Sequence, residues 1–249
     1  MTVLPVGLPA DLVCMVTPEG ERTSRESAHV SDELGLLREF YRDMTLIRRL
    51  DTEAYALQRH GELGLWAPLF GQEAAQIGAG RALADQDWVF PSYREHGIGW
   101  CRGIGPEKLL GSFRGTHMSG WDPYEHRYAF GQIIIGAQTL HAVGYALGLQ
   151  LDGLVGNDDP SRDTAVLTAF GDGATSQGDV AEAMMWASSY QAPVVFFCQN
   201  NHYAISVPVQ RQSRYPLAHR ARGFGFDGIA VDGNDVLAVY DTVRTALDK

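Results

Sequence analysis

The pattern of hydrophobic positions changes its period along the chain. Between residues 31 and 60, apolar side chains return every three or four positions, which predicts an amphipathic helix. Ser31 or Asp32 is the expected N-cap of this helix, and Gly61 is the expected stop. Further stretches with the pattern or composition of helices are 71–83, 105–115 and 136–151.

The second half of the chain contains continuous apolar runs. "TAVLTAF" (164–170), "PVVFFCQ" (193–199) and "GIAVDG" (228–233) are expected to be strands of a parallel sheet, the first two of them covered on both faces. A shorter strand is expected at the start of "DWVFPSYREHG" (87–97). Helical stretches follow the later strands, at 179–190 and from an N-cap at Asn234. Strands that alternate with helices predict an α/β fold with a doubly wound, mostly parallel sheet flanked by helices.

The domain organisation is expected to be simple. Residues 1–30 mix proline, glycine and charge without a clear period, and we interpret them as an N-terminal arm. Residues 31–249 are expected to form a single α/β domain.

Charge and cysteine content narrow the class of protein. The formal net charge is −10, so the chain would be repelled by a nucleic-acid backbone, and we expect no nucleic-acid partner. No apolar stretch approaches the length needed to cross a bilayer, so no membrane association is expected. The 3 cysteines lie far apart and form no CxxC pair, which favours a reducing, cytoplasmic location.

The stretch "FGDGATSQGD" (170–179) carries the main chemical signal. Asp172 follows one apolar run and Asn201 follows the next, so both are expected at the same edge of the sheet. Their oxygens, with the backbone carbonyl of Tyr203, could hold Mg²⁺ together with phosphate oxygens and water. Gly173 would let a diphosphate approach the backbone, and the helix that starts near Gly178 would offer free N–H groups. Alternatively "GDG" is only a strand-ending turn and "NN" only a loop, but the order and spacing favour the site.

The motifs resemble those of a known family. "GDG" followed at this distance by "NN" is similar to the thiamine-diphosphate signature. The stretches "FPSYREHG", "APLFGQEAAQIG", "IIIGAQ" and "FFCQNNHYAISVPVQRQ" together resemble the α subunit of the decarboxylating component of 2-oxo acid dehydrogenase complexes, the pyruvate and branched-chain family. The resemblance runs from about residue 31 to residue 249.

This resemblance implies roles for individual residues. Asp172, Asn201 and the carbonyl of Tyr203 would be the Mg²⁺ ligands. The residues that it places against thiamine diphosphate are Tyr93, Arg94, Ile133, Ile135, Asp172, Gly173, Ala174 and Asn201. Arg94 would bind phosphate oxygens through its guanidinium, Ile135 would support the bent cofactor, and Ile133 would contact its pyrimidine through the backbone. A buried core role is the alternative for the isoleucines.

The catalytic residues are left open. His96 either touches the substrate or cofactor or only shapes its loop. The family carries a loop with a catalytic His and Ser beyond the segment that ends at Lys249, and these 249 residues do not contain it. We therefore expect either a fragment or a chain without that loop.

The resemblance also implies an activity and its partners. This is oxidative decarboxylation of a 2-oxo acid, with acyl transfer to a lipoyl group on an acyltransferase component. A β subunit is expected to complete the enzyme, as two α and two β chains. The expected substrate is the branched-chain 2-oxo acid 3-methyl-2-oxobutanoate, pyruvate, or both, and a pyruvate-specific enzyme is the alternative. Ala67, where mammalian pyruvate enzymes have a substrate-contacting His, favours the branched or a broader substrate.

Other functions compete with this one. A transketolase-type thiamine enzyme would share the diphosphate site, although "YREHG" and "GQEAAQIG" argue against it. A non-catalytic chain that serves as a scaffold for a β subunit is the other alternative. The dinucleotide-binding pattern GxGxxG occurs at 223–228, but it does not follow a predicted strand and open a helix, so we reject that function.

Overall fold

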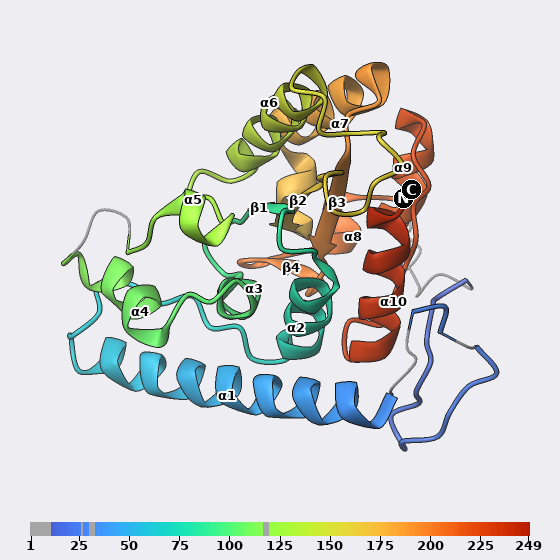
Figure 1. Ribbon diagram of the computed structural model, residues 1–249. Coiled ribbons are helices and arrows are strands. Elements are labelled where there is room, and N and C mark those ends of the chain that lie inside the picture. Colours follow the sequence, from blue (N-terminus) through green and yellow to red (C-terminus); the bar gives the residue numbers. More distant parts are fainter. Residues whose placement is uncertain (1–10, 26, 30–32, 117–119) are drawn as a thin grey trace. The chain divides into compact units, whose positions relative to one another are not determined.

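The computed structural model describes residues 11–25, 27–29, 33–116 and 120–249 (Figure 1). Its contacts divide the chain into two compact units. Unit 1 contains 1–13, 86–92 and 132–232, and unit 2 contains 14–85, 93–131 and 233–249. The single domain expected over 31–249 stays a prediction.

Unit 1 is built around a parallel sheet. Its described strands are β1 (Trp88–Phe90), β2 (Val166–Gly171) and β3 (Val194–Gln199), in the order β1-β2-β3. The register pairs Trp88 with Val166 and continues to Gly171 opposite Gln199. Helices α6 (Ala137–Leu151) and α7 (Gly178–Tyr190) connect the strands in sequence. The expected fold class, α/β with a mostly parallel sheet flanked by helices, is confirmed.

The core of unit 1 explains why the apolar runs form strands. Residues 166–170 of β2 are fully buried, as expected for a central strand. Helix α6 contacts the strands, and its small residues Ala142 and Ala146 lie in one cluster with Ala183 and Ala187 of α7. The expectation that β3 is also buried is wrong: its residues 194–198 are only half-buried, because β3 lies at the edge of the described sheet.

Short elements follow the main strands. The 3₁₀ turn η1 (Asp172–Ser176) continues directly from β2. After β3 come β4 (Tyr203–Ala204) and β5 (Val207–Pro208), which form an antiparallel hairpin, and then α8 (Val209–Gln212), α9 (Leu217–Ala221) and the 3₁₀ turn η2 (Arg222–Phe224). No local sequence pattern predicts these helices and strands, because each is too short to show a period.

The strand expected at 228–233 does not form. Only Val231 makes a bridge there, parallel to Val13, through hydrogen bonds from Val13 N to Ala230 O (2.8 Å) and from Asp232 N to Val13 O (2.9 Å). The segment finds a single partner residue among those described, and the glycines at its two ends disfavour extended pairing.

Unit 2 is helical. Its elements are α1 (Glu33–Arg59), α2 (Glu73–Ala82), α3 (His96–Cys101), α4 (Pro106–Arg114), α5 (Pro123–His126) and α10 (Val236–Leu247). Helices α2 and α10 pack closely, because a Cβ on Gly78 would lie 2.9 Å from the Val236 carbonyl oxygen. Helix α1 ends just before Gly61, which has a φ of +80° as a helix stop requires. The expected N-caps Ser31 and Asp32 lie outside the described residues.

The start of α10 differs from expectation. Its N-cap is Asp235, whose Oδ1 accepts from Ala238 N at 3.0 Å, and not Asn234. The same carboxylate accepts from Met15 N (2.6 Å) and Val16 N (2.7 Å). Residues near position 15, expected in a separate arm, are therefore bound to unit 2. None of the helices that the structure describes is long and apolar enough to cross a membrane.

Candidate functional site

The ends of β2 and β3 bring the main candidate residues to one edge of the sheet. Gly171 pairs with Gln199 in the last step of the parallel register. Asp172 follows Gly171 directly, and Asn200 and Asn201 follow Gln199 directly. Because parallel strands leave a sheet in the same direction, Asp172 and Asn201 emerge at the same edge.

Asp172 is a buried carboxylate at this edge. Its side chain is only 2% exposed, and its Oδ2 accepts a hydrogen bond from Gln212 Nε2 at 3.1 Å. Thr175 closes the turn by donating from Oγ1 to the Asp172 carbonyl oxygen at 2.7 Å. Burial and the nearby Asp172 charge raise the pKa of the Cys198 thiol to about 12. The edge therefore combines a buried carboxyl group with a neutral thiol.

Asn201 and Tyr203 lie in an exposed turn. Asn201 Oδ1 accepts from Tyr203 N at 3.0 Å, and Asn200 Oδ1 accepts from His202 N at 3.0 Å. His202 and Ile205 have φ values of 69° and 56°, so the backbone here is irregular. Amide oxygens, backbone carbonyls and carboxylates are oxygen donors of the kind that Mg²⁺ takes.

The donor set fits a cation that is shared with phosphate and water. Among the described residues no group of three or more His, Cys, Asp or Glu side chains could hold a metal ion. The ligand set expected from the sequence has one carboxylate, that of Asp172, and the neutral oxygens of Asn201 and Tyr203. That is typical of Mg²⁺ bound together with a diphosphate and not in an all-protein cage.

Gly173 and Ala174 form the turn after Asp172. A Cβ on Gly173 would lie 2.7 Å from Ala204 Cβ, so packing against β4 alone already requires glycine here. Ala174 is 3% exposed and packs with Phe170 and Val180. Helix α7 follows from Gln177, which makes no side-chain cap, so its first N–H groups have no side-chain partner there.

The isoleucines before α6 are exposed. Ile133 is 65% exposed and Ile135 is 40% exposed, so the alternative of a buried core role is wrong. A Cβ on Gly136 would lie 3.1 Å from Val180 and 3.4 Å from Gln177, which places this turn against the start of α7. Solvent-exposed apolar side chains beside η1 and α7 are suited to an apolar ligand surface.

Tyr93 and Arg94 belong to unit 2. The Arg94 guanidinium donates to the Pro68 carbonyl oxygen and lies over the Tyr93 ring, 5.4 Å from its centroid. Gln76 holds this turn, because its Nε2 donates to the Arg94 carbonyl oxygen (3.1 Å) and its Oε1 accepts from Gly97 N (2.8 Å). Their predicted contact with a diphosphate stays a prediction.

His96 is packed in an aromatic cluster. Its ring stacks on Trp66 with centroids 4.2 Å apart and meets Phe113 edge-on. Trp66 is fixed in turn by Asp51, which accepts from the indole Nε1 at 2.6 Å. Burial, with the Arg94 charge, lowers the pKa of His96 to about 3, so the imidazole is neutral near pH 7. This packing favours the loop-shaping role of the two left open.

Sequence reasoning missed several residues around the strand ends. Gln212 contacts Asp172, and Arg220 donates from Nη1 and Nη2 to Thr175 Oγ1 (3.2 Å) and the Thr175 carbonyl oxygen (3.1 Å). In unit 2, the sequence indicated only that Gln76 lies in a helix, and its hydrogen bonds with Arg94 and Gly97 were missed. The first two lie 40 and 45 positions from their partners, and no local pattern indicates such a contact.

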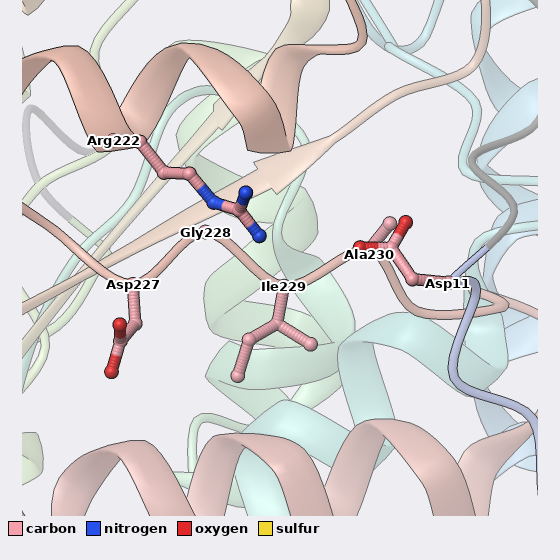
Figure 2. A pocket seen from close by; sticks show the side chains of 6 residues that line it. All are labelled: Asp11, Arg222, Asp227, Gly228, Ile229 and Ala230. Carbon is pink, nitrogen blue, oxygen red and sulfur yellow. The ribbon is translucent and has the colours of Figure 1, made fainter.

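A separate shallow hollow of ≈ 270 Å³ lies elsewhere in unit 1. It is lined by Asp11, Arg222, Asp227, Gly228, Ile229 and Ala230. Figure 2 shows the Arg222 guanidinium above the backbone of Gly228 and Ile229, whereas the Asp227 side chain points the other way. None of the predicted site residues lines this hollow.

Comparisons with known proteins bear on the family. The family model described as "Dehydrogenase E1 component" matches residues 41–249. The 3-methyl-2-oxobutanoate dehydrogenase subunit alpha of Mycobacterium tuberculosis (strain ATCC 25618 / H37Rv) is 45% identical over 236 residues, 94% of this chain and 62% of that protein.

Bacillus subtilis (strain 168) has two further relatives. Its pyruvate dehydrogenase E1 component subunit alpha is 39% identical over 220 residues, 86% of this chain and 56% of that protein. Its 2-oxoisovalerate dehydrogenase subunit alpha is 34% identical over 223 residues, 85% of this chain and 65% of that protein. The chain thus spans less than two thirds of the length of these relatives. The resemblance drawn from the motifs is confirmed, and the chain belongs to the dehydrogenase E1 component family.

Proposed function

We propose that this chain is the α subunit of a 2-oxo acid dehydrogenase and binds thiamine diphosphate with Mg²⁺. The observation that supports this most directly is the pairing of Gly171 with Gln199, because it brings Asp172 and Asn201 to one edge of the sheet. A buried carboxylate beside neutral oxygen donors suits a divalent cation that a diphosphate helps to hold.

The residues of unit 1 have separable tasks in this proposal. Asp172, Asn201 and the Tyr203 carbonyl would hold the cation. Gly173, Ala174 and the first N–H groups of α7 would face the diphosphate, and Ile133 and Ile135 would offer an apolar surface to the rings of the cofactor. Tyr93 and Arg94 are proposed as diphosphate ligands on the ground of the family resemblance.

The proposed reaction is decarboxylation of a 2-oxo acid with acyl transfer to a lipoyl group. Thiamine diphosphate, when bound, would supply the nucleophilic carbon and the electron sink for this chemistry. The chain's own residues would bind and orient it. We propose a β subunit as the partner, in an assembly of two α and two β chains, and a lipoyl-bearing acyltransferase component as the acyl acceptor. His96 is neutral and buried, so we assign it no proton transfer.

The test is a titration of thiamine diphosphate with and without Mg²⁺, in the presence and absence of the β subunit. Calorimetry should detect binding that EDTA abolishes. Asp172→Asn should remove binding in the range where the wild-type chain saturates, because the amide cannot replace the anionic ligand. Asp152→Asn, an exposed carboxylate at the end of α6, is the matched control and should bind normally. Unchanged affinity in Asp172→Asn would refute the proposal.

A further inference from the structure

We infer that Gln212 is a positioning residue for the Asp172 carboxylate and sets the affinity of the cation site. The inference rests on the proposed function, because it concerns the same Mg²⁺-diphosphate site. Gln212 lies in α8, 40 residues after Asp172, and would act on the cation only through Asp172.

The hydrogen bonds of Gln212 fix both ends of its contact. Its Nε2 donates to Asp172 Oδ2 at 3.1 Å and to the Val207 carbonyl oxygen at 3.3 Å. A side-chain amide nitrogen has two N–H groups, so both are used. The bond to Val207 holds the amide against β5, which directly precedes α8. The bond to Asp172 joins the same amide to the end of β2.

The other carboxylate oxygen is left for a ligand. No hydrogen bond from the described residues reaches Asp172 Oδ1, although the side chain is only 2% exposed. A carboxylate with one oxygen bonded to an amide keeps its second oxygen in a defined orientation. Partners of this kind orient metal ligands, and their loss typically costs about 10- to 100-fold in metal affinity.

The contact also links the two strand ends to each other. Asn201, Tyr203 and Gln212 all lie in the segment that follows β3. This segment runs through the hairpin of β4 and β5 into α8. The hairpin packs on η1, since Gly173 has no room for a Cβ beside Ala204. Gln212 therefore couples the oxygen donors after β3 to the one after β2 before a cation binds.

Arg220 supports the turn from the same side. It donates to both the hydroxyl and the carbonyl oxygen of Thr175, whose hydroxyl in turn donates to the Asp172 carbonyl oxygen. The backbone of η1 is thus fixed by Arg220, while the Asp172 side chain is fixed by Gln212. Gln212 can therefore be substituted while the hydrogen bonds that hold the backbone of η1 remain in place.

The experiment measures Mn²⁺, as a probe for Mg²⁺, by electron paramagnetic resonance in the presence of thiamine diphosphate and the β subunit. Gln212→Met keeps the length of the side chain and removes both donors. Gln210→Met is the matched control, since Gln210 is the same residue type in the same helix. We expect Gln212→Met to weaken Mn²⁺ binding by about 10- to 100-fold and Gln210→Met to leave it unchanged.

A second readout separates positioning from a general structural role. The unfolding temperature without cation should be similar for the two methionine variants. Hydrogen exchange at residues 172–176 should be the same in the two variants, because the bonds from Arg220 and Thr175 that hold the turn do not involve Gln212. If Gln212→Met lowers the unfolding temperature but leaves Mn²⁺ affinity unchanged, Gln212 is only structural and the inference is wrong. Equal loss in Gln210→Met would also overturn it.

The failure of this inference is distinguishable from failure of the proposed function. Asp172→Asn is measured in the same series. If it abolishes Mn²⁺ binding while Gln212→Met binds like the wild type, the cation site stands and the role of Gln212 falls. If Asp172→Asn binds Mn²⁺ as the wild type does, or the wild type binds none, the proposed site is wrong and the inference falls with it.

Discussion

At the scale of single residues, His96 predicts a pH dependence of stability. Its pKa in the folded protein is about 3, lowered from 6.5 by burial and by the Arg94 charge. Below about pH 6.5 the His96 imidazole takes up a proton in the unfolded chain but not in the folded protein. The contribution of His96 to the free energy of unfolding is therefore complete above about pH 6.5 and is lost as the pH falls towards 3. At pH 5 the loss is about 2 kcal/mol relative to pH 7.5.

His96→Phe should remove this dependence while it keeps a ring on Trp66. The measurement is denaturant unfolding of both proteins at pH 7.5 and pH 5, from which the two differences in free energy of unfolding are compared. The difference should be smaller in the variant by about 2 kcal/mol. His141→Gln, which changes an exposed histidine of α6, should behave like the wild type. An unchanged pH dependence in His96→Phe would show that the ring is protonated without penalty.

Gly173 carries a second prediction at this scale. A methyl group there would lie 2.7 Å from Ala204 Cβ, so Gly173→Ala should lower the free energy of unfolding by about 1–3 kcal/mol, the usual cost of overpacking. Gly171→Ala, whose added Cβ meets only a carbonyl oxygen at 3.9 Å, should cost less. Adding Ala204→Gly to Gly173→Ala should restore much of the stability.

The double variant also separates two reasons for the glycine. If Gly173→Ala with Ala204→Gly is stable but binds thiamine diphosphate weakly, the diphosphate itself needs the bare backbone. If stability and binding recover together, packing against β4 accounts for Gly173. No recovery of stability would mean that the contact with Ala204 is not the cause.

At the scale of elements, α10 depends on a single carboxylate for its start. Asp235 caps the helix through Ala238 N and also accepts from Met15 N and Val16 N, at 6% exposure. Asp235→Ala should lower the free energy of unfolding by about 2–4 kcal/mol, because the helix loses its cap and the backbone N–H groups of Met15 and Val16 lose their acceptor. Asp235→Asn should cost less, since its oxygen can still cap. Urea unfolding measures the free energy of unfolding of both variants. Equal losses would contradict the prediction that Asp235→Asn is the milder change.

The elements also show what the sequence could and could not predict. Helix α1 and strand β2 were predictable because a long helical period and a continuous apolar run are local signals. The cap of α10 was missed by one position, since Asn234 and Asp235 are both good caps and only the contact with residues 15 and 16 decides between them. The strand at 228–233 failed because pairing needs a partner, which a local apolar pattern does not guarantee.

In the candidate site, too, the sequence could predict some features and not others. The spacing of Asp172 and Asn201 was sufficient to predict a common edge, because a parallel strand pair with a connecting helix fixes it. The contact of Gln212 with Asp172 was not predictable, because it depends on how a short hairpin folds back over 40 residues of chain. The packing of His96 on Trp66 was not predictable either, because the two residues lie 30 positions apart and no local pattern connects them.

At the scale of the whole molecule, the open question is the substrate. With the β subunit proposed above, we predict that the chain decarboxylates 3-methyl-2-oxobutanoate more efficiently than pyruvate. Identity is 45% to the mycobacterial 3-methyl-2-oxobutanoate dehydrogenase subunit and 39% to the Bacillus subtilis pyruvate dehydrogenase subunit. Ala67, small and 8% exposed, stands where the resemblance puts a substrate-contacting His in mammalian pyruvate enzymes.

The measurement is kcat/KM for each 2-oxo acid with a lipoyl-bearing acceptor. One extra methylene in a fitting pocket contributes about 10- to 200-fold. Because 3-methyl-2-oxobutanoate has an isopropyl group where pyruvate has a methyl group, the preference should be at least about 10-fold. Ala67→His should shift the ratio towards pyruvate, and its unfolding temperature must be followed because the position is buried. A preference for pyruvate would assign the chain to the other substrate class, whereas ketol transfer without a lipoyl acceptor would indicate transketolase-type chemistry. Cofactor binding without turnover of either acid would favour the non-catalytic scaffold.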